Sequence, residues 1–449
     1  MAHFDTSGLQ PAADALTARG IDVVRLGYAD IIGTDRGRDV LVNRFARTVG
    51  SGVAFCRSVY GTTPRGGVVD IEGGLSDGLP DVLAFPDLST VREIPWERGV
   101  AHVIADVFNP DGSPSLESPR MALKGVLARF EELGASPIVG PELEFYVLEE
   151  SATSPSGWQR YGEGTGNVYT SGLKGDPENV LLDSLRMLGA YGIEAVAANH
   201  EFSSGQFEIN LWHGEALDAA DRAHRFKTAV QELSRRQGKL ATFMAKPFND
   251  EGGSGYHLHF SCWSGEQPLF DDPDSPDGLS EMAHHAIGGI LAHAPAIAAF
   301  SNPTINSYKR FGPDTLAPWL VDWGLDNRSA MVRIPPERGE ASRLELRLGD
   351  ASANSYLAVG SMLAGAYLGI REHIEPPAPL TGYGYDPSKA PKLPQTLGEA
   401  LDALEADPAI REVMGPPLVA AFLTYKRDEL DRFNHWITDW EFEEYTYHL

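Results

Sequence analysis

The segment 252–261 alternates polar and apolar residues after a glycine-rich start. Because the side chains of a β-strand point alternately to opposite faces, His257, His259 and Ser261 would form one polar row, backed by apolar residues. The glycines would allow a close backbone approach or a positive φ angle. Two histidines on a polar strand face can equally be a hydrogen-bonded pair. The pattern therefore predicts a strand and leaves its role open.

Three other segments repeat this two-residue period or can pair in the same way. Their polar members are Glu142 and Glu144, then Glu201 and Glu208 around a Ser-Ser-Gly turn, and Arg343, Glu345 and Arg347 between leucines. Taken singly, the first also fits a solvated strand edge, the second a charged hairpin and the third a self-neutralising ladder. The ladder is the weakest of these alternatives, because the leucines require that strand to be buried.

The remaining pattern predicts strands and helices in alternation. Strands are expected at 23–28, 39–42, 101–107 and 139–148. Helices are expected at 10–19, 119–133, 179–188, at 281–300 with an interruption at Pro295, and from a cap at Asp218 to about 238, whereas 151–172 should be a long loop. Beyond 351 the chain should be mostly helical, apart from a Pro/Gly-rich connector. Strong turn formers at 109–114 predict a domain boundary, which gives domains 1–112 and 113–449. Without a nucleotide-binding glycine fingerprint, the expected fold class is α+β.

Composition excludes several classes of function. The formal net charge of −26 argues against a nucleic-acid partner, which would need clustered Lys and Arg. The two cysteines lack metal-ligand spacing and fit a reducing compartment. The start of the chain has no apolar signal core, and the most apolar run, 356–370, is too short to cross a bilayer and suits a closely packed buried helix. We therefore predict a cytoplasmic protein without a membrane partner.

Together, the four segments offer five carboxylates and a histidine on polar strand faces. Clustered like charges are unfavourable unless cations neutralise them. Carboxylates with an imidazole and no thiolate suit Mg²⁺ or Mn²⁺, and this many acids imply two or more ions. Such sites usually serve phosphoryl transfer, in which arginines bind carboxylate or phosphate groups. The arginines available for this are Arg310, Arg328, Arg333, Arg343 and Arg347.

These motifs resemble those of the glutamine synthetase family and occur in the same order. They lie within 141–145, 200–208, 246–261, 306–310, 327–329 and 343–347. The resemblance implies an N-terminal β-grasp domain and a catalytic domain with a curved antiparallel sheet flanked by helices. It also implies a homododecamer of two stacked hexameric rings, with active sites between subunits.

The resemblance further implies roles for individual residues. One metal ion would be held by Glu144, Glu201 and Glu208, and another by Glu142, His257 and Glu345. ATP would contact His259, Ser261, Arg333 and Arg343, and L-glutamate would contact Gly253, His257, Arg310 and Arg347. The implied catalytic residues are Arg328, next to the transferred phosphate, with Arg310 and Arg347.

The sequence departs from this family at the ammonia site. Ammonia-using members carry an Asp-Gly-Ser-Ser motif whose acid binds ammonium, and 55–60 offers no acid here. They also carry a Glu six residues after the Tyr-Lys-Arg arginine, where this chain has Leu316, and an Asn where it has Gly252. The nucleotide, metal and glutamate chemistry is therefore expected to be retained without the ammonia pocket.

These features predict an ATP-dependent ligase that joins the γ-carboxylate of L-glutamate to an amine through γ-glutamyl phosphate. The expected acceptor is an organic amine, specifically a polyamine such as putrescine or spermine. Acids near the presumed mouth would hold its second ammonium and tyrosines would add cation–π contact. The candidates are Asp250, Glu251, Asp314 and Glu163, with Tyr60 or Tyr161.

Three alternatives stay open. The acceptor can be another small amine such as ethanolamine, or ammonia itself bound through a different acid. A third possibility is a catalytically silent regulatory homologue that binds ATP and metal. The complete set of six metal-ligand candidates argues against this last alternative.

Overall fold

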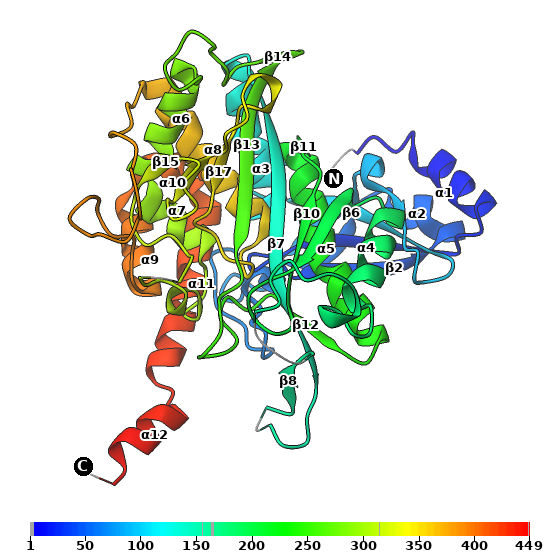
Figure 1. Ribbon diagram of the computed structural model, residues 1–449. Helices are drawn as coiled ribbons and strands as arrows, with labels where there is room; N and C mark the ends of the chain where they lie inside the picture. Colours follow the sequence, from blue (N-terminus) through cyan, green and yellow to red (C-terminus); the bar gives the residue numbers. More distant parts are fainter. Residues whose placement is uncertain (1–3, 155, 163–165, 314, 448) are drawn as a thin grey trace.

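A computed structural model describes residues 4–154, 156–162, 166–313, 315–447 and 449. It confirms the α+β class: a small sheet near the N-terminus and a large sheet in the centre, with helices packed around both (Figure 1). The small sheet takes its strands from 23–108 and the large one from 136–346. The boundary predicted at residue 112 falls between the two sheets and stays a prediction.

The N-terminal sheet has the strand order β2-β1-β6-β4-β3, with β5 paired to β6. Only β1 and β6 run parallel; the other pairs are antiparallel. Two helices, α1 (Leu9–Ala18) and α2 (Phe45–Val49), accompany it. Its strands are β1 (Val23–Ala29), β2 (Asp35–Leu41), β3 (Val53–Cys56), β4 (Asp81–Pro86), β5 (Arg92–Glu93) and β6 (Val100–Phe108).

The central sheet follows the order β15-β16-β17-β13-β7-β10-β9, and four short strands pair to β7 or β13. It is antiparallel as expected, except that β15 and β16 run parallel. Its main strands are β7 (Ser136–Glu150), β9 (Ala195–His200), β10 (Gln206–Leu211), β13 (Tyr256–Ser264), β15 (Trp323–Leu325), β16 (Val332–Ile334) and β17 (Leu344–Leu346). The short ones are β8 (Trp158–Arg160), β11 (Gly214–Glu215), β12 (Leu240–Thr242) and β14 (Gln267–Pro268).

Helix α8 (Ser355–Glu372) is buried along nearly its whole length, as its Gly/Ala-rich sequence predicts. Small residues let its backbone pass very close to α6 (Glu281–Ala292): a Cβ on Gly369 would lie 2.0 Å from the His285 carbonyl oxygen. The other helices of this domain are α3 (Pro119–Glu132), α4 (Val180–Ala190), α5 (Ala216–Arg236), α7 (Ala294–Ser301), α9 (Leu397–Ala406), α10 (Pro408–Met414), α11 (Pro416–Asn434) and α12 (Asp439–Tyr445).

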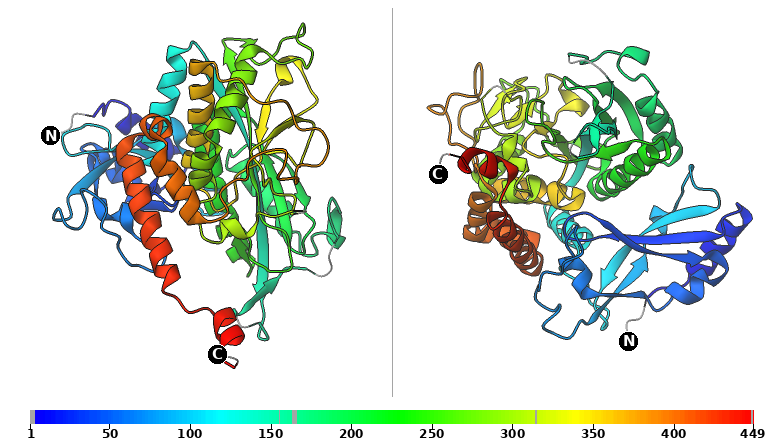
Figure 2. Two further views of the ribbon diagram at one scale, coloured as in Figure 1. Left: turned by 90° about the vertical axis from the view of Figure 1, so that its left-hand side faces the viewer. Right: turned by 90° about the horizontal axis from the view of Figure 1, so that it is seen from below.

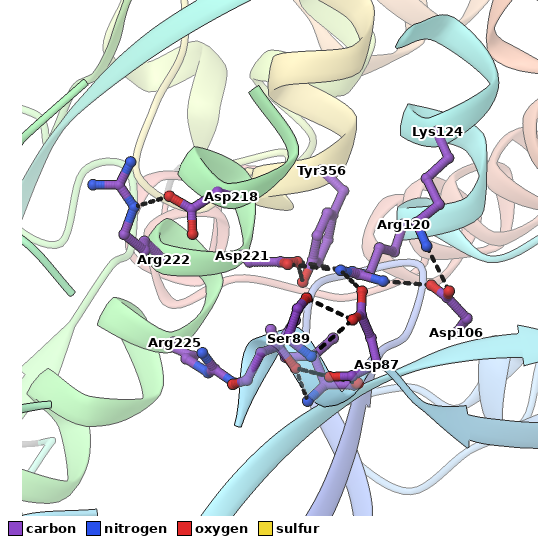
Figure 3. A network of polar contacts seen from close by, with 12 residues as sticks. Asp87, Ser89, Asp106, Arg120, Lys124, Asp218, Asp221, Arg222, Arg225 and Tyr356 are labelled. Atoms are coloured by element: carbon purple, nitrogen blue, oxygen red, sulfur yellow. Dashed lines mark hydrogen bonds and ion pairs between the residues drawn. The ribbon is translucent and has the colours of Figure 1, made fainter. Parts of the chain in front are cut away.

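A buried ion network around Arg120 on α3 links the N-terminal sheet to the helices beside the central sheet (Figure 3). Its guanidinium contacts Asp87, directly after β4, Asp106 on β6 and Asp221 on α5. The hydroxyl of Tyr356 donates to Asp221 at 2.8 Å. A buried arginine needs this many partners to offset its desolvation, so the network holds α3 and α5 against the N-terminal sheet.

The structure corrects some local predictions. Asp218 does not cap α5; Glu215 is the N-cap residue, and Asp218 lies in the first turn, paired with Arg222 at 2.8 Å. The segment 151–172, expected as a loop, contains β8, which forms because its residues pair with β7, a tertiary contact that local preference does not reveal. The interruption predicted within 281–300 is confirmed: the chain forms two helices, α6 and α7, with Pro295 in the first turn of the second.

Candidate active site

The polar faces of four neighbouring strands come together on one side of the central sheet. Glu144 lies opposite Glu208 in the β7–β10 pair, and Glu142 lies opposite His257 in the β7–β13 pair. On the other edge of β13, His259 lies opposite Glu345. The residues between them, such as Leu143 and Phe207, are buried in the core. Because the acidic side chains recur at every second residue of each strand, they form one acidic surface across the sheet.

Two groups of these side chains have the spacing of a metal site. The potential ligand atoms of Glu142, His257 and Glu345 all lie within 4.8 Å of one another, and so do those of Glu144, Glu208 and His257. The first group is the predicted set. The second group contains His257 in place of the predicted Glu201. Glu201 and Glu208 nevertheless line one cavity. The assignment of these residues as metal ligands stays a prediction.

The carboxylates on the β10 side are electrostatically uncompensated. Burial, followed by the charges of Glu142, Glu144 and Glu201, raises the pKa of Glu208 to about 9. Burial and the charge of Glu144 raise the pKa of Glu201 to about 7. Near neutral pH, Glu208 therefore retains a proton that a cation would displace. This arrangement fits a divalent ion, which replaces protons among clustered acids.

On the β17 side, positive groups balance the acids. Burial, the largest single effect, raises the pKa of Glu345, but the charges of Arg347, His259 and His257 together outweigh it and lower this pKa to about 2. Arg333 and Arg347 each contact one oxygen of Glu345 at 2.6 Å. For Glu142, hydrogen bonds with His257 and His259 overcome burial and lower its pKa well below the ordinary value.

The three predicted catalytic arginines line one cavity of about 1340 Å³ together with the acids. Arg310 and Arg347 are buried in its wall, whereas Arg328 is exposed. Arg347 is held by Glu345 and by the carbonyl oxygen of Arg328, to which its Nε donates at 3.1 Å. Gly253 also lines the cavity: a Cβ there would lie 2.3 Å from Cγ of Arg310, so only glycine fits. The structure thus brings the predicted glutamate-binding residues together.

The predicted ATP residues lie beyond the lining of this cavity, further along β13 and its neighbours. Arg343 donates through Nε to Nδ1 of His259 at 3.2 Å, and Nε2 of His259 is 3.1 Å from Glu142. Ser261 accepts a hydrogen bond from the Trp263 indole at 3.1 Å, and Arg333 pairs with Glu345. Their roles toward ATP stay predictions.

Leu316, which the family resemblance predicts to stand in place of the ammonia-site acid, lines the cavity with 54% of its surface exposed. Its φ angle is +61°, a left-handed conformation that is uncommon for leucine. Other exposed apolar side chains share the cavity with it. They are Tyr169, Phe202, Leu325 and Tyr383.

The acids and tyrosines predicted to hold a distal ammonium are not part of the described lining of the cavity. Asp250 and Glu251 are paired with Arg160. Tyr60 and Tyr161 are each about 2% exposed or less, because both rings pack into the core. Glu163 and Asp314 lie outside the described residues.

Sequence reasoning missed several polar residues that support the acids. Gln206 donates to Glu144 at 3.1 Å, Asn199 to Glu201 at 2.8 Å and Asn210 to Glu208 at 3.1 Å. For Gln206 and Asn210 a signal was present, since both share the two-residue period of Glu208 on β10. Of the apolar residues at the cavity, Leu325 ends the short strand β15 and the others lie in loops, where no periodicity marks them.

A sheet that brings acids, a histidine and arginines into one cavity suits an enzyme that transfers phosphoryl groups, because such sites hold divalent ions and bind phosphate. The family model for the glutamine synthetase catalytic domain matches residues 116–445. The glutamine synthetase of Thermotoga maritima is 35% identical over 94% of this chain and 96% of its own length. That of Methanocaldococcus jannaschii is 33% identical over 97% and 98%. A solved structure named as a GmaS/ADP complex superimposes with a TM-score of 0.86 at 31% identity, over 97% of this chain and 99% of that one.

The chain therefore belongs to the glutamine synthetase family. Members of this family are ligases that use ATP and a divalent metal ion, Mg²⁺ or Mn²⁺, and the carboxylate and histidine groups here fit such ions. Among the helices that the structure describes, none has the length and hydrophobicity needed to cross a membrane.

Proposed function

We propose that this chain joins the γ-carboxylate of L-glutamate to an organic amine at the expense of ATP. In the first step, the γ-carboxylate attacks the γ-phosphorus of ATP and ADP leaves. In the second step, the amine attacks the acyl carbon of γ-glutamyl phosphate, phosphate leaves, and the nitrogen loses a proton. The observation that carries the proposal is that Leu316 lies exposed at the cavity. The sequence resemblance implies an acid at this position in ammonia-using members.

The chain's own residues have distinct tasks in this reaction. Arg310 and Arg347 bind the carboxylate end of glutamate through bidentate contacts, which a planar guanidinium makes well. Arg328, exposed at the same cavity, reaches the transferred phosphoryl group. Glu142, His257 and Glu345 would hold one divalent ion, and Glu144 and Glu208 with Glu201 another. When bound, these ions supply positive charge that offsets the phosphate oxygens of ATP.

The apolar surroundings of Leu316 suit an acceptor that carries an alkyl group. Tyr169 and Phe202, 72% and 55% exposed, face the same cavity. Removing water from an alkylammonium lowers its pKa, which favours the neutral nucleophile. The relatedness to GmaS, a γ-glutamylmethylamide synthetase, supports an alkylamine acceptor, whereas the relatives named glutamine synthetase support ammonia.

The finer proposal from the sequence is a polyamine such as putrescine or spermine. The alkyl part of such a molecule is supported by the apolar lining. Its second ammonium lacks support from Asp250 and Glu251, because both are paired with Arg160. Acids of a neighbouring subunit would have to bind it, in a ring-shaped assembly of the kind the sequence predicts. A cytoplasmic location and the double-ring dodecamer form part of the same proposal.

The test is an amine panel at equal concentration, with ATP, Mg²⁺ and L-glutamate fixed and phosphate release measured. Methylamine, butylamine, ethanolamine, putrescine and spermine should each be compared with ammonium. We expect organic amines to support turnover and ammonium to support little. If ammonium is the best acceptor, the protein is a glutamine synthetase. If butylamine supports the same turnover as putrescine, the second ammonium group contributes nothing and the polyamine proposal is rejected. A catalytically silent homologue would release no phosphate with any of these amines.

A further inference from the structure

Arg310 is a nearly buried cation with few partners. It is 4% exposed although it lines the cavity. Its Nη1 donates to Oδ1 of Asn302 at 3.3 Å, and within the described part of the chain its Nε has no hydrogen-bond partner. A guanidinium in such a place is stable only if a nearby negative charge offsets its desolvation.

Asp350, a buried carboxylate outside the described lining of the cavity, is the main source of this charge. Its side chain is fully buried, and Oδ1 accepts hydrogen bonds from the backbone N–H and hydroxyl of Ser352. Oδ2 has no partner among the described residues. Burial lowers the pKa of Arg310, and Asp350 exerts the strongest of the attractions that oppose it, ahead of Glu144.

The backbone fixes Asp350 beside the segment that carries the partner of Arg310. The N–H of Asp350 donates to the carbonyl oxygen of Ser301 at 3.0 Å, one residue before Asn302, and Asp350 forms a β-bridge with Gly255. Further buried polar atoms in this neighbourhood lack a partner among the described residues. They are Oγ of Ser254, Oγ of Ser301, Nδ2 of Asn302 and the hydroxyl of Tyr308. Buried polar groups of this kind are normally linked by ordered water.

We propose that Asp350 positions Arg310 for glutamate binding, through a buried polar network that links its free oxygen to the guanidinium. The inference rests on the proposed function, in which Arg310 binds the carboxylate end of glutamate. Arg347 repels Arg310 electrostatically. Asp350 therefore keeps Arg310 in place while no glutamate is bound, and it acts on glutamate only through that arginine.

Asp350→Asn tests this, because it removes the charge and keeps the shape. We expect the apparent KM for glutamate to rise by about tenfold or more, the loss expected for one charged hydrogen-bonding partner. The KM for ATP and the kcat at saturating glutamate should stay within about threefold of the wild type. Asp322→Asn is the matched control. Asp322 is also buried with one unpartnered oxygen among the described residues, and Met331 donates to it.

A charge relocation separates positioning from a purely structural role. In the double variant Asp350→Asn/Asn302→Asp, the carboxylate moves to the residue that already contacts Arg310, so the KM for glutamate should recover in part. Loss of the Ser352 contacts would not be rescued in this way. If Asp350→Asn does not fold, Tyr308→Phe removes one hydroxyl of the network, and it should raise only the KM for glutamate, by about threefold.

The outcomes are separable from those of the proposed function. A wild-type protein without glutamate-dependent ADP formation would reject the function itself. An active wild type, with folded Asp350→Asn or Tyr308→Phe variants that keep the wild-type KM for glutamate, would overturn the role of Asp350 alone. The same holds if Asn302→Asp gives no recovery.

Discussion

Glu345 is a buried carboxylate with two predicted roles, binding a metal ion or neutralising arginines. The structure pairs it with Arg333 and Arg347, and with His257 and Glu142 it forms one of the two candidate metal groups. Glu345→Gln should therefore lower glutamate-dependent ADP formation by at least about 100-fold. It should also lower the melting temperature, because two buried ion pairs lose their charge.

Metal binding, measured by calorimetric titration with Mn²⁺, distinguishes the two tasks. Glu345→Gln should weaken it, whereas Glu149→Gln, on the same sheet outside the metal groups, should leave both binding and activity intact. Unchanged Mn²⁺ affinity together with lower stability would mean that Glu345 serves only its arginines.

Arg347 allows a prediction about glutamate alone. Arg347→Lys keeps the positive charge but cannot contact Glu345, the Arg328 carbonyl and a substrate carboxylate in one plane. The apparent KM for glutamate should rise by about tenfold with little change in the KM for ATP. Steady-state kinetics with each substrate varied in turn gives both constants. A selective loss of ATP affinity would instead place Arg347 at the nucleotide.

The uncompensated acids predict how stability depends on pH without metal. Glu208 and Glu201 have folded-state pKa values raised to about 9 and about 7, above the ordinary value of 4.5. Their contribution is fully present below about pH 4.5 and is lost as the pH rises toward 9, because the folded state holds protons that the unfolded chain has released.

Thermal unfolding in the presence of a chelator should therefore show a falling melting temperature over that range, and Mg²⁺ or Mn²⁺ should reduce the fall. Glu208→Gln removes the most strongly shifted group, so its pH dependence should be shallower than that of the wild type. If the melting temperatures of the two proteins fall equally with pH, the pKa of Glu208 is not raised in the folded state.

At the scale of elements, strict alternation made β13, β7 and β17 predictable, because a two-residue period fixes which side chains share a face. Pairing partners were not predictable: that Arg333 rather than Arg343 meets Glu345 follows from the register of β16 and β17. The apolar side of the cavity was beyond prediction for a different reason. Its residues lie on separate loops and at the end of the short strand β15, and no local pattern in the sequence shows that these segments meet.

The segment between Arg310 and β15 should control the choice of nitrogen donor. Leu316→Glu places a carboxylate at the exposed position that faces the cavity, where it can attract ammonium. We expect the ratio of kcat/KM for ammonium to kcat/KM for methylamine to rise by about tenfold, which is the change expected from one modest charge interaction. Leu325→Glu, on the same cavity and 44% exposed, is the control and should change the ratio little. Equal effects of both would mean that charge anywhere in the cavity suffices.

At the scale of the whole molecule, the C-terminal arm, residues 433–447 and 449, has an exposed apolar surface that contacts within a single chain do not account for. Helix α11 leaves the body of the protein and α12 lies beyond it, away from both sheets (Figures 1 and 2). The exposed large apolar residues of this arm are Phe433, Trp436, Ile437, Trp440, Phe442, Tyr445, Tyr447 and Leu449. An exposed apolar surface of this kind marks a contact with another molecule. A second copy of the chain fits the predicted ring-on-ring assembly.

Truncation after Asn434 should therefore reduce the assembly to smaller species, because burying each large apolar side chain contributes roughly 1.5–3 kcal/mol. Light scattering coupled to size exclusion measures the mass of each species. The double variant Trp440→Ala/Phe442→Ala should act in the same direction. Glu443→Ala/Glu444→Ala, on the same helix, should leave the mass unchanged, since exposed acids contribute little to contact. If the truncated chain keeps the full mass, the arm is not what joins the copies, and the N-terminal sheet with its unpaired edge strands β2 and β3 becomes the surface to test.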